Sequence, residues 1–200
     1  MIETTAVLQP REFPTAVNKW AKPIVSSAAK HGVPASLVAA FMATESGGNP
    51  NAATFCCYGL MGFLPATASW VAGRQVTPAE LTGEPELSID LGAKLIRMLW
   101  DKYNGNVVKM AATYNAGSVK CGAPGKCPNA PNQWKVITDC AQGKAVDYPG
   151  RIILHNNQAV ESGLFGPGAA GGGGSKNGLL LPLLLVGGVA GAWYFTRGKR

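Results

Sequence analysis

Histidine is scarce in this sequence. The chain has 2 histidines among 200 residues, His31 and His155. Neither lies at a zinc-ligand spacing from the 5 cysteines, and no paired Cys-x-x-Cys units occur, so the usual zinc patterns are excluded. No histidine stands in a context that would activate a cysteine nucleophile. The cysteines are Cys56, Cys57, Cys121, Cys127 and Cys140, and their odd number leaves the pairing open, including a bond from Cys121 to Cys127 or Cys140.

Charge is also sparse, because only 14% of the residues are charged whereas 46% are hydrophobic. Such a chain can bury one substantial core. The formal net charge is +7, and part of it lies at the carboxyl end, at Lys176, Arg197, Lys199 and Arg200. The other basic residues are not clustered with aromatic residues or on one helix, so nucleic-acid binding is not expected. Mild basicity suits an anionic polymer, although ordinary domains show it equally often.

The amino terminus lacks the apolar core of a secretory signal, since residues 1–14 carry mixed charges and two prolines. By contrast, an uncharged apolar run of about 17 residues extends from Leu179 to Phe195, close to the shortest helix that spans a bilayer. Trp193 and Tyr194 suit the membrane interface, and a basic flank follows them. We predict a carboxy-terminal transmembrane anchor; a buried helix of the main domain is the weaker alternative.

Composition divides the chain into five parts. A glycine-rich stretch with the composition of a flexible linker separates the apolar run from the rest of the chain. We therefore assign an amino-terminal extension at 1–14, a folded domain at 15–162, a linker at 163–177, a transmembrane helix at 178–196 and a basic tail at 197–200.

Helical periodicity dominates the folded domain. Between Pro34 and Glu45, apolar residues recur at intervals of three, four and seven, and Glu45 continues their stripe. The stripe consists of Leu37, Val38, Phe41 and Met42. Burial on this face should raise the pKa of Glu45 toward the range in which a general acid works at neutral pH. The alternative is a helix-terminal glutamate that bends into solvent.

The rest of the domain is predicted to be mainly α as well. We expect helices at 15–31, interrupted near Pro23, and at 65–73, 87–103, 106–114, 132–142 and 147–160, with a surface loop at 49–58. Leu64 should pack beneath the 65–73 helix together with Ala68 and Val71. Asp90 and Asp101 fall on the polar stripe of the 87–103 helix, and we expect both to be solvated charges.

Several short motifs follow one another in a fixed order. They are Glu45-Ser46-Gly-Gly-Asn49-Pro50-Asn51, Gly59-Leu60-Met61, Pro65-Ala-Thr-Ala68, Ser88-Ile-Asp-Leu-Gly-Ala-Lys-Leu-Ile96, Tyr114-Asn115-Ala116-Gly117 and Tyr148-Pro-Gly-Arg151-Ile152. Together they resemble the catalytic domain of the lytic transglycosylases of the lysozyme superfamily, over roughly residues 20–155. The resemblance implies a lysozyme-like helical domain.

The resemblance also implies roles for the matched residues. Glu45 would be the catalytic acid and base, Ser46 would help to orient it, and Tyr148 would donate a hydrogen bond to it. From the sequence alone, Tyr148 could equally be an aromatic residue of a turn.

Substrate binding is implied for the residues Gly59, Leu60, Met61, Tyr114 and Asn115. In this interpretation Tyr114 packs beneath the cleft and Asn115 hydrogen-bonds the sugar or the backbone near it; the alternative is a core tyrosine followed by a helix stop. Glycines at 59 and 62 let the backbone approach a sugar. Gly62, however, stands where the family usually has glutamine, which puts subsite contacts in doubt.

Lytic transglycosylases cleave the β-1,4 bond between N-acetylmuramic acid and N-acetylglucosamine without water. The resemblance implies that one carboxyl group protonates the leaving oxygen and then accepts the proton of the muramic C6 hydroxyl, which closes an anhydro ring. No second carboxylate is then required, and no metal or organic cofactor. The alternatives are a hydrolytic muramidase on the same fold, with a second carboxylate such as Asp90, and an inactive wall-binding membrane or virion protein.

The predicted anchor and the missing signal suggest two settings. We favour an enzyme carried in the membrane of a phage particle, which opens the wall during entry. The competing setting is the bacterial inner membrane, facing the periplasm, in a conjugation or secretion system. The expected partners are peptidoglycan strands, the lipid bilayer and other virion or envelope proteins.

Overall fold

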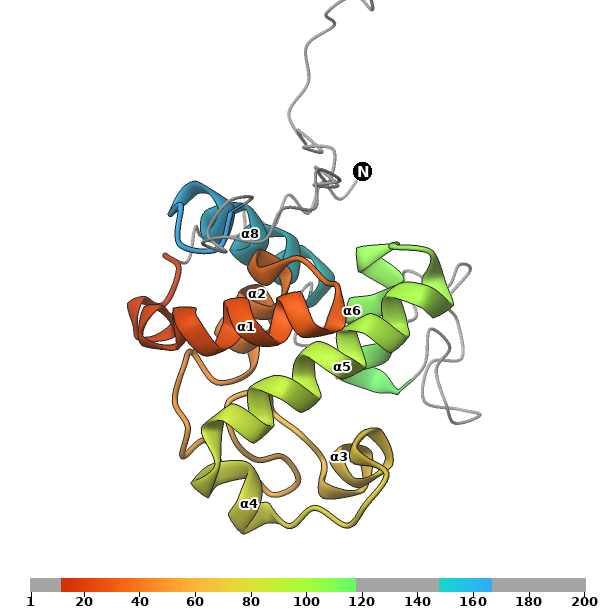
Figure 1. The fold of residues 1–200 in the computed structure, drawn as a ribbon. Helices are drawn as coiled ribbons and strands as arrows, with labels where there is room; N and C mark the ends of the chain where they lie inside the picture. Colours follow the sequence, from red (N-terminus) through yellow and green to blue (C-terminus); the bar gives the residue numbers. More distant parts are fainter. Residues whose placement is uncertain (1–11, 118–147, 167–200) are drawn as a thin grey trace, which may run out of the picture.

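The computed structural model describes residues 12–117 and 148–166. These two ranges contain η1 (Thr15–Trp20), α1 (Ala21–His31), α2 (Ala35–Glu45), α3 (Pro65–Ala72), α4 (Pro78–Gly83), α5 (Pro85–Tyr103), α6 (Val107–Ala116) and α8 (Tyr148–Glu161) (Figure 1). The only β structure within them is a pair of isolated antiparallel bridges, from Ala53 to Tyr58 and from Tyr58 to Phe63. The predicted mainly α class is confirmed.

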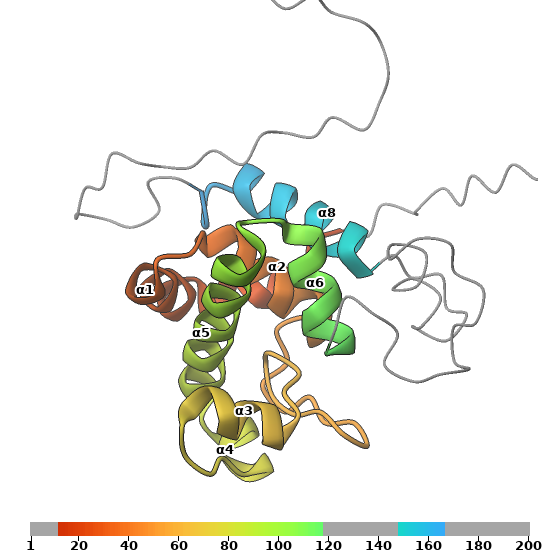
Figure 2. The ribbon, with the colours of Figure 1, turned by 90° about the vertical axis from the view of Figure 1, so that its right-hand side faces the viewer.

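Helix α2 lies in the middle of the domain, as the two views in Figures 1 and 2 show. Helices α1, α5 and α8 and the short η1 all pack against it. Every residue from Ser36 to Ala43 is buried. The predicted apolar stripe is buried, but it is not the only buried face, because a helix that is surrounded on all sides is apolar all round. Glu45, the last residue of α2, projects from a segment that the core holds in place.

Residues 15–31, predicted as one interrupted helix, form two consecutive helices. The 3-10 helix η1 passes into α1 at Ala21, and Pro23 lies within the first turn of α1. The amide groups of a first turn have no intrahelical acceptor, so proline is tolerated there and the helix continues through it. At the junction, Trp20 Nε1 donates a hydrogen bond to Gly48 O at 3.0 Å, which ties η1 to the turn after α2.

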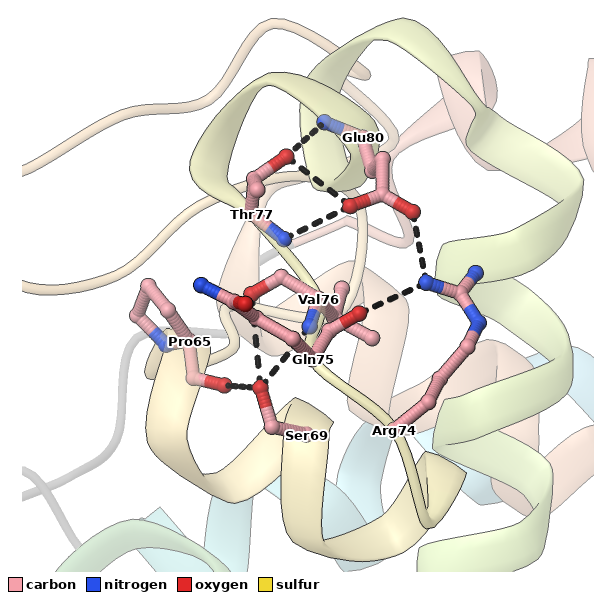
Figure 3. A network of polar contacts seen from close by, with 7 residues as sticks. All are labelled: Pro65, Ser69, Arg74, Gln75, Val76, Thr77 and Glu80. Atoms are coloured by element: carbon pink, nitrogen blue, oxygen red, sulfur yellow. Dashed lines mark hydrogen bonds and ion pairs between the residues drawn. The ribbon is translucent and has the colours of Figure 1, made fainter.

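A polar network fixes the connection between α3 and α4 (Figure 3). Ser69 Oγ accepts a hydrogen bond from Val76 N at 2.9 Å, and Arg74 pairs with Glu80 at 2.7 Å. Thr77 and Glu80 cap α4 reciprocally, and these contacts, led by the hydrogen bond from the Thr77 amide, lower the pKa of Glu80 to about 2. Helix α4 was not expected from the sequence, although the spacing of Thr77 and Glu80 is a capping-box signature.

Two side chains differ from expectation. Leu64, predicted to pack beneath α3, is 48% exposed because it is the extended residue that precedes the helix, whereas Ala68 and Val71 are buried as predicted. Asp90, predicted to be a solvated charge, accepts hydrogen bonds from Lys30 Nζ at 2.9 Å and lies 2.9 Å from His31 Nε2. Burial opposes ionisation of Asp90, but these partners outweigh it and lower its pKa. The pairing joins α5 to α1.

Aromatic residues near both predicted domain limits belong to the same core. Phe165 is buried, and its ring lies 6.1 Å from that of Phe13 between centroids. The remaining predictions, for a helix at 132–142 and for the apolar run from Leu179 to Phe195, lie outside the described residues, as do Cys121, Cys127 and Cys140. Among the helices at 12–117 and 148–166, none combines the length and the apolar character needed to cross a bilayer.

Candidate active site

Glu45 is partly buried at the carboxyl end of α2. Its carboxyl group accepts a hydrogen bond at Oε1 from the hydroxyl of Tyr148, the first residue of α8. Arg151, one turn further along α8, has its guanidinium group 5.9 Å from the centre of the Tyr148 ring. Helix α8 packs against α2 and thus brings a phenol and a positive charge to the end of that helix.

The surroundings of Glu45 favour the protonated acid. Desolvation by burial raises its pKa from 4.5 to about 7, and the hydrogen bond from Tyr148 and the charge of Arg151 offset only part of this effect. Burial and the charge of Glu45 also raise the pKa of Tyr148 well above its usual value, so the phenol remains a hydrogen-bond donor. A carboxyl group with a pKa near 7 can both give and take a proton at neutral pH.

Gly62 faces the second carboxyl oxygen of Glu45. A Cβ atom at this position would lie 2.4 Å from Glu45 Oε2 and 3.0 Å from its Cδ, and the backbone has a φ of 61°. Glycine therefore suits both the positive φ and the close approach of the carboxyl group. The sequence pointed only to a missing glutamine here; nothing in a single sequence shows that residues 45 and 62 are in contact.

Ser46 supports the site through the backbone rather than through Glu45. Its Oγ donates a hydrogen bond to Leu60 O at 2.7 Å and accepts one from Gly48 N at 3.1 Å. The end of α2 is thereby tied to the segment 59–62. The orienting role expected for Ser46 stays a prediction, which these contacts would serve through the backbone.

The segment Gly59–Leu60–Met61 returns beside Glu45, but two of its side chains point into the core. Leu60 and Met61 are fully buried, backbone included, so neither residue is exposed to a substrate in this structure. Gly59 has a φ of 75°, and a Cβ there would lie 2.1 Å from Leu81 O. The tight packing of Gly59 holds the turn in place.

Tyr114 lies beneath this turn. Its hydroxyl donates a hydrogen bond to Met61 O at 2.8 Å, and its ring packs against Phe41 with centroids 4.6 Å apart. Burial and the charge of Glu45 raise the pKa of Tyr114. Asn115 is exposed at the end of α6. The structure thus gathers Ser46, Tyr114 and Tyr148 around Glu45, adds Gly62 and Arg151, and leaves Asn115 on the surface.

Residues 12–117 and 148–166 contain no group of three or more His, Cys, Asp and Glu side chains that could hold a metal ion. Three other acidic residues have basic partners: Asp90 pairs with Lys30, Glu80 with Arg74 and Asp101 with Arg97. Glu45 is the carboxyl group whose environment suits proton transfer.

Comparison with known families gives one match. A family model described as the Transglycosylase SLT domain matches residues 22–137. The matched range includes α2, α5 and α6 but ends before α8, which supplies Tyr148 and Arg151.

Solved structures with the same fold include the lytic transglycosylase Slt from Pseudomonas aeruginosa, in an inactive mutant form, with a TM-score of 0.59 and 22% identity over 78% of this chain and 25% of that one. The 70 kDa soluble lytic transglycosylase from Escherichia coli gives a TM-score of 0.55 and 21% identity over 78% of this chain and 26% of that one. A complex of the 70-kDa soluble lytic transglycosylase with bulgecin A gives a TM-score of 0.57 and 18% identity, covering 75% and 25%. This chain therefore spans about a quarter of the length of each of these proteins.

Proposed function

The chain belongs to the family of transglycosylase SLT domains, and from this premise we propose that it is a peptidoglycan lytic transglycosylase. It cleaves the β-1,4 bond between N-acetylmuramic acid and N-acetylglucosamine and leaves 1,6-anhydromuramic ends. The observation that carries the proposal is the carboxyl group of Glu45, which has a pKa of about 7 and a hydrogen bond from Tyr148.

In the proposed reaction, Glu45 first acts as an acid. Because Oε1 accepts the hydrogen bond from Tyr148, the proton is delivered from Oε2, the oxygen that faces Gly62. It passes to the glycosidic oxygen as the bond from that oxygen to the muramic C1 breaks. The leaving sugar departs with a new hydroxyl group, and positive charge develops at C1.

Glu45 then acts as a base. The hydrogen bond from Tyr148 and the positive charge of Arg151 stabilise its carboxylate form. The carboxylate removes the proton of the muramic C6 hydroxyl while that oxygen bonds to C1, which closes the anhydro ring and returns Glu45 to its protonated form. Water takes no part, so one carboxyl group is sufficient.

A hydrolytic muramidase is less well supported. Two-carboxylate glycosidases place their carboxyl groups about 5–9.5 Å apart across the scissile bond. Glu45 interacts electrostatically with Tyr148, Arg151, Tyr114 and Cys57, none of which is a carboxylate. Asp90, the candidate for a second carboxylate, is paired with Lys30. An inactive wall-binding protein remains the alternative that the Glu45→Gln experiment tests.

The proposal is tested by replacing Glu45 with glutamine, which keeps the shape of the side chain but cannot supply the proton. We expect Glu45→Gln to lower the rate of peptidoglycan degradation by about 10²–10⁴-fold. The matched control is Glu86→Gln, which removes a carboxylate from an exposed position in the first turn of α5 and should leave activity unchanged. Retention of activity by Glu45→Gln would overturn the proposal.

We further propose that the apolar run from Leu179 to Phe195 tethers the enzyme to a membrane and that the glycine-rich linker lets it reach the wall. The setting we favour is the membrane of a phage particle, with local wall opening during entry. Recovery of the protein in purified virions, released with their lipid by detergent, is the expected result. Its recovery only from the envelopes of uninfected cells would contradict this setting.

A further inference from the structure

Two adjacent cysteines lie at the edge of the candidate active site, and the proposed reaction uses neither. Cys56 and Cys57 are free thiols, and both are partly buried. They occupy the turn that the Ala53–Tyr58 bridge closes. Their neighbour Phe55 is 99% exposed, so the tip of the turn is open to small molecules.

Thr54 determines the conformation of this turn. Its amide donates a hydrogen bond to Cys57 O at 2.9 Å, and its Oγ1 accepts one from Cys57 N at 3.0 Å. The same oxygen lies 3.7 Å from Cys56 Sγ. The hydrogen bonds that hold the reduced turn therefore require the backbone of both cysteines to keep its position.

The turn is connected to Glu45 in two ways. The charge of Glu45 contributes to the raised pKa of Cys57, which places this thiol within electrostatic range of the carboxyl group. The chain also leads directly from Cys57 into Tyr58, which exchanges backbone hydrogen bonds of 2.9 and 3.0 Å with Phe63. These bonds bracket the segment that ends at Gly62, against Glu45 Oε2. A shift at Cys57 is thus passed to the backbone that determines where the carboxyl group lies.

We propose that Cys56 and Cys57 form a reversible thiol–disulfide site that controls Glu45. The reduced pair permits catalysis, and a disulfide between the two cysteines blocks it. The effect of the disulfide on activity rests on the proposed transglycosylase function, whereas the formation of the disulfide does not.

Ring closure explains why the oxidised form is inactive. Neighbouring Cα atoms are about 3.8 Å apart across a trans peptide. Bridged cysteines usually have Cα atoms about 4.4–6.8 Å apart. A bond between neighbours therefore requires the backbone to distort, and the hydrogen bonds that join Thr54 to Cys57 cannot all persist. The displacement reaches Tyr58 and then the segment beside Glu45.

The oxidant is a low-molecular-weight disulfide, and the two thiols have different roles. Cys56, which adjoins the exposed Phe55 at the tip of the turn, supplies the attacking thiolate, whereas burial and the neighbouring Cys56 raise the pKa of Cys57 to about 12. The Cys56 thiolate bonds to one sulfur of the oxidant and releases the other as a thiolate. Cys57 then loses its proton and attacks Cys56 Sγ, which releases the second thiolate. The oxidant gains two electrons, and its two thiolates take up the two protons that the cysteines lose.

The experiment uses the full chain, incubated with oxidised glutathione and then with dithiothreitol. Peptide mapping by mass spectrometry should show a Cys56–Cys57 peptide that is lighter by two hydrogen atoms after oxidation. Peptidoglycan degradation should fall on the order of tenfold to a hundredfold and recover after reduction. Cys56→Ser should keep the activity of the reduced protein and lose its sensitivity to oxidation. A variant with serine at Cys121, Cys127 and Cys140 should remain sensitive.

Three results would overturn the proposal. The first is a disulfide from Cys56 or Cys57 to one of the other three cysteines. The second is the absence of a disulfide between Cys56 and Cys57 after oxidation. The third is a Cys56–Cys57 disulfide that leaves activity unchanged. A reduced protein with no activity would instead count against the proposed transglycosylase function. In that case the peptide map still decides whether the redox site exists.

Discussion

At the scale of single residues, the proposed chemistry depends on how three influences on Glu45 balance. Burial raises its pKa, whereas Tyr148 and Arg151 lower it, and the outcome is a value of about 7. Burial alone would give an acid too weak to release its proton readily, and strong pairing would leave a carboxylate that has no proton to give. The balance lets one group serve both steps.

The pH dependence follows from this balance. The first step needs protonated Glu45, so wild-type activity should fall as the pH rises through about 7. Tyr148→Phe removes the hydrogen bond that lowers this pKa, so the fall should move to higher pH. The maximal rate should also drop by about tenfold, because the carboxylate of the second step loses a donor. Rates measured from weakly acidic to alkaline pH test this; a flat wild-type profile would contradict it.

Gly62 gives a second prediction at the residue scale. In Gly62→Ala the new Cβ would lie 2.4 Å from Glu45 Oε2, so the carboxyl group must move, and we expect a loss of activity of about 10²-fold. Gly73→Ala is the matched control, because Gly73 has a φ of 71° and nothing within 4 Å of its added Cβ. Both variants introduce strain of about 1–2 kcal/mol at a positive φ, which thermal unfolding would report. Equal activity in the two variants would refute the role of Gly62.

At the scale of secondary-structure elements, the alignment of α8 on α2 carries the site. Besides Tyr148, α8 contributes His155, which is buried and lies with Nδ1 3.0 Å from Thr44 Oγ1. Thr44 donates its own hydroxyl hydrogen to Ala40 O at 2.9 Å, so the imidazole is the donor in this contact. The hydrogen bond ties α8 to the residue that precedes Glu45.

Thr44→Val removes the acceptor for His155 while keeping the shape of the side chain. We expect α8 to loosen at this point and the hydrogen bond from Tyr148 to weaken, which moves the fall in activity to higher pH, as in Tyr148→Phe but by less. Thr82→Val is the control, because it also removes a hydroxyl that bonds to the preceding turn, but in α4. If Thr44→Val lowers stability and leaves the pH profile unchanged, the contact is structural only.

The extent to which the elements could be predicted from sequence depended on the kind of signal. Helices α2, α5 and α6 were predicted because apolar periodicity is local. The burial of α2 on all sides could not be deduced, since it depends on which helices surround it. Asp90 was misjudged for the same reason: its partner Lys30 is 60 residues away in the sequence. Helix α4 was missed although its capping box is a local signal.

At the scale of the whole molecule, the burial of Glu45 lowers the free energy of unfolding once the carboxyl group is ionised. Folding raises the pKa of Glu45 from 4.5 to about 7, so the folded state binds more protons than the unfolded state between these values. Stability therefore falls as the pH rises through this window, and above it the folded protein holds an ionised carboxylate that burial disfavours.

Glu45→Gln should remove this loss. Near pH 8 the variant should be more stable than the wild type, by on the order of 3 kcal/mol, and below pH 4.5 the two should be similar. Denaturant unfolding at both pH values measures the difference, with Glu86→Gln, a substitution of an exposed carboxylate on α5, as the control. A Glu45→Gln variant that is less stable near pH 8 would contradict the raised pKa.

The candidate site was only partly visible in the sequence because it is assembled from distant segments. Glu45 was identified from a local pattern and from motif order, whereas its contact with Tyr148 joins residues 103 positions apart. The proximity of Gly62 to Glu45 and the electrostatic effect of Arg151 on it appeared only in the folded chain. Motif order identified Glu45 and Tyr148, whereas the relation of Gly62 and Arg151 to Glu45 depends on the fold.

The central claim is that Glu45 drives ring closure by the substrate's own C6 hydroxyl, without water. The most direct test is digestion of purified peptidoglycan in water enriched in heavy oxygen, followed by mass spectrometry of the released fragments, with Glu45→Gln as the paired control. We predict 1,6-anhydromuramic ends without heavy oxygen from the wild type and almost no fragments from the variant. Reducing muramic ends that carry heavy oxygen would show hydrolysis and would contradict the account.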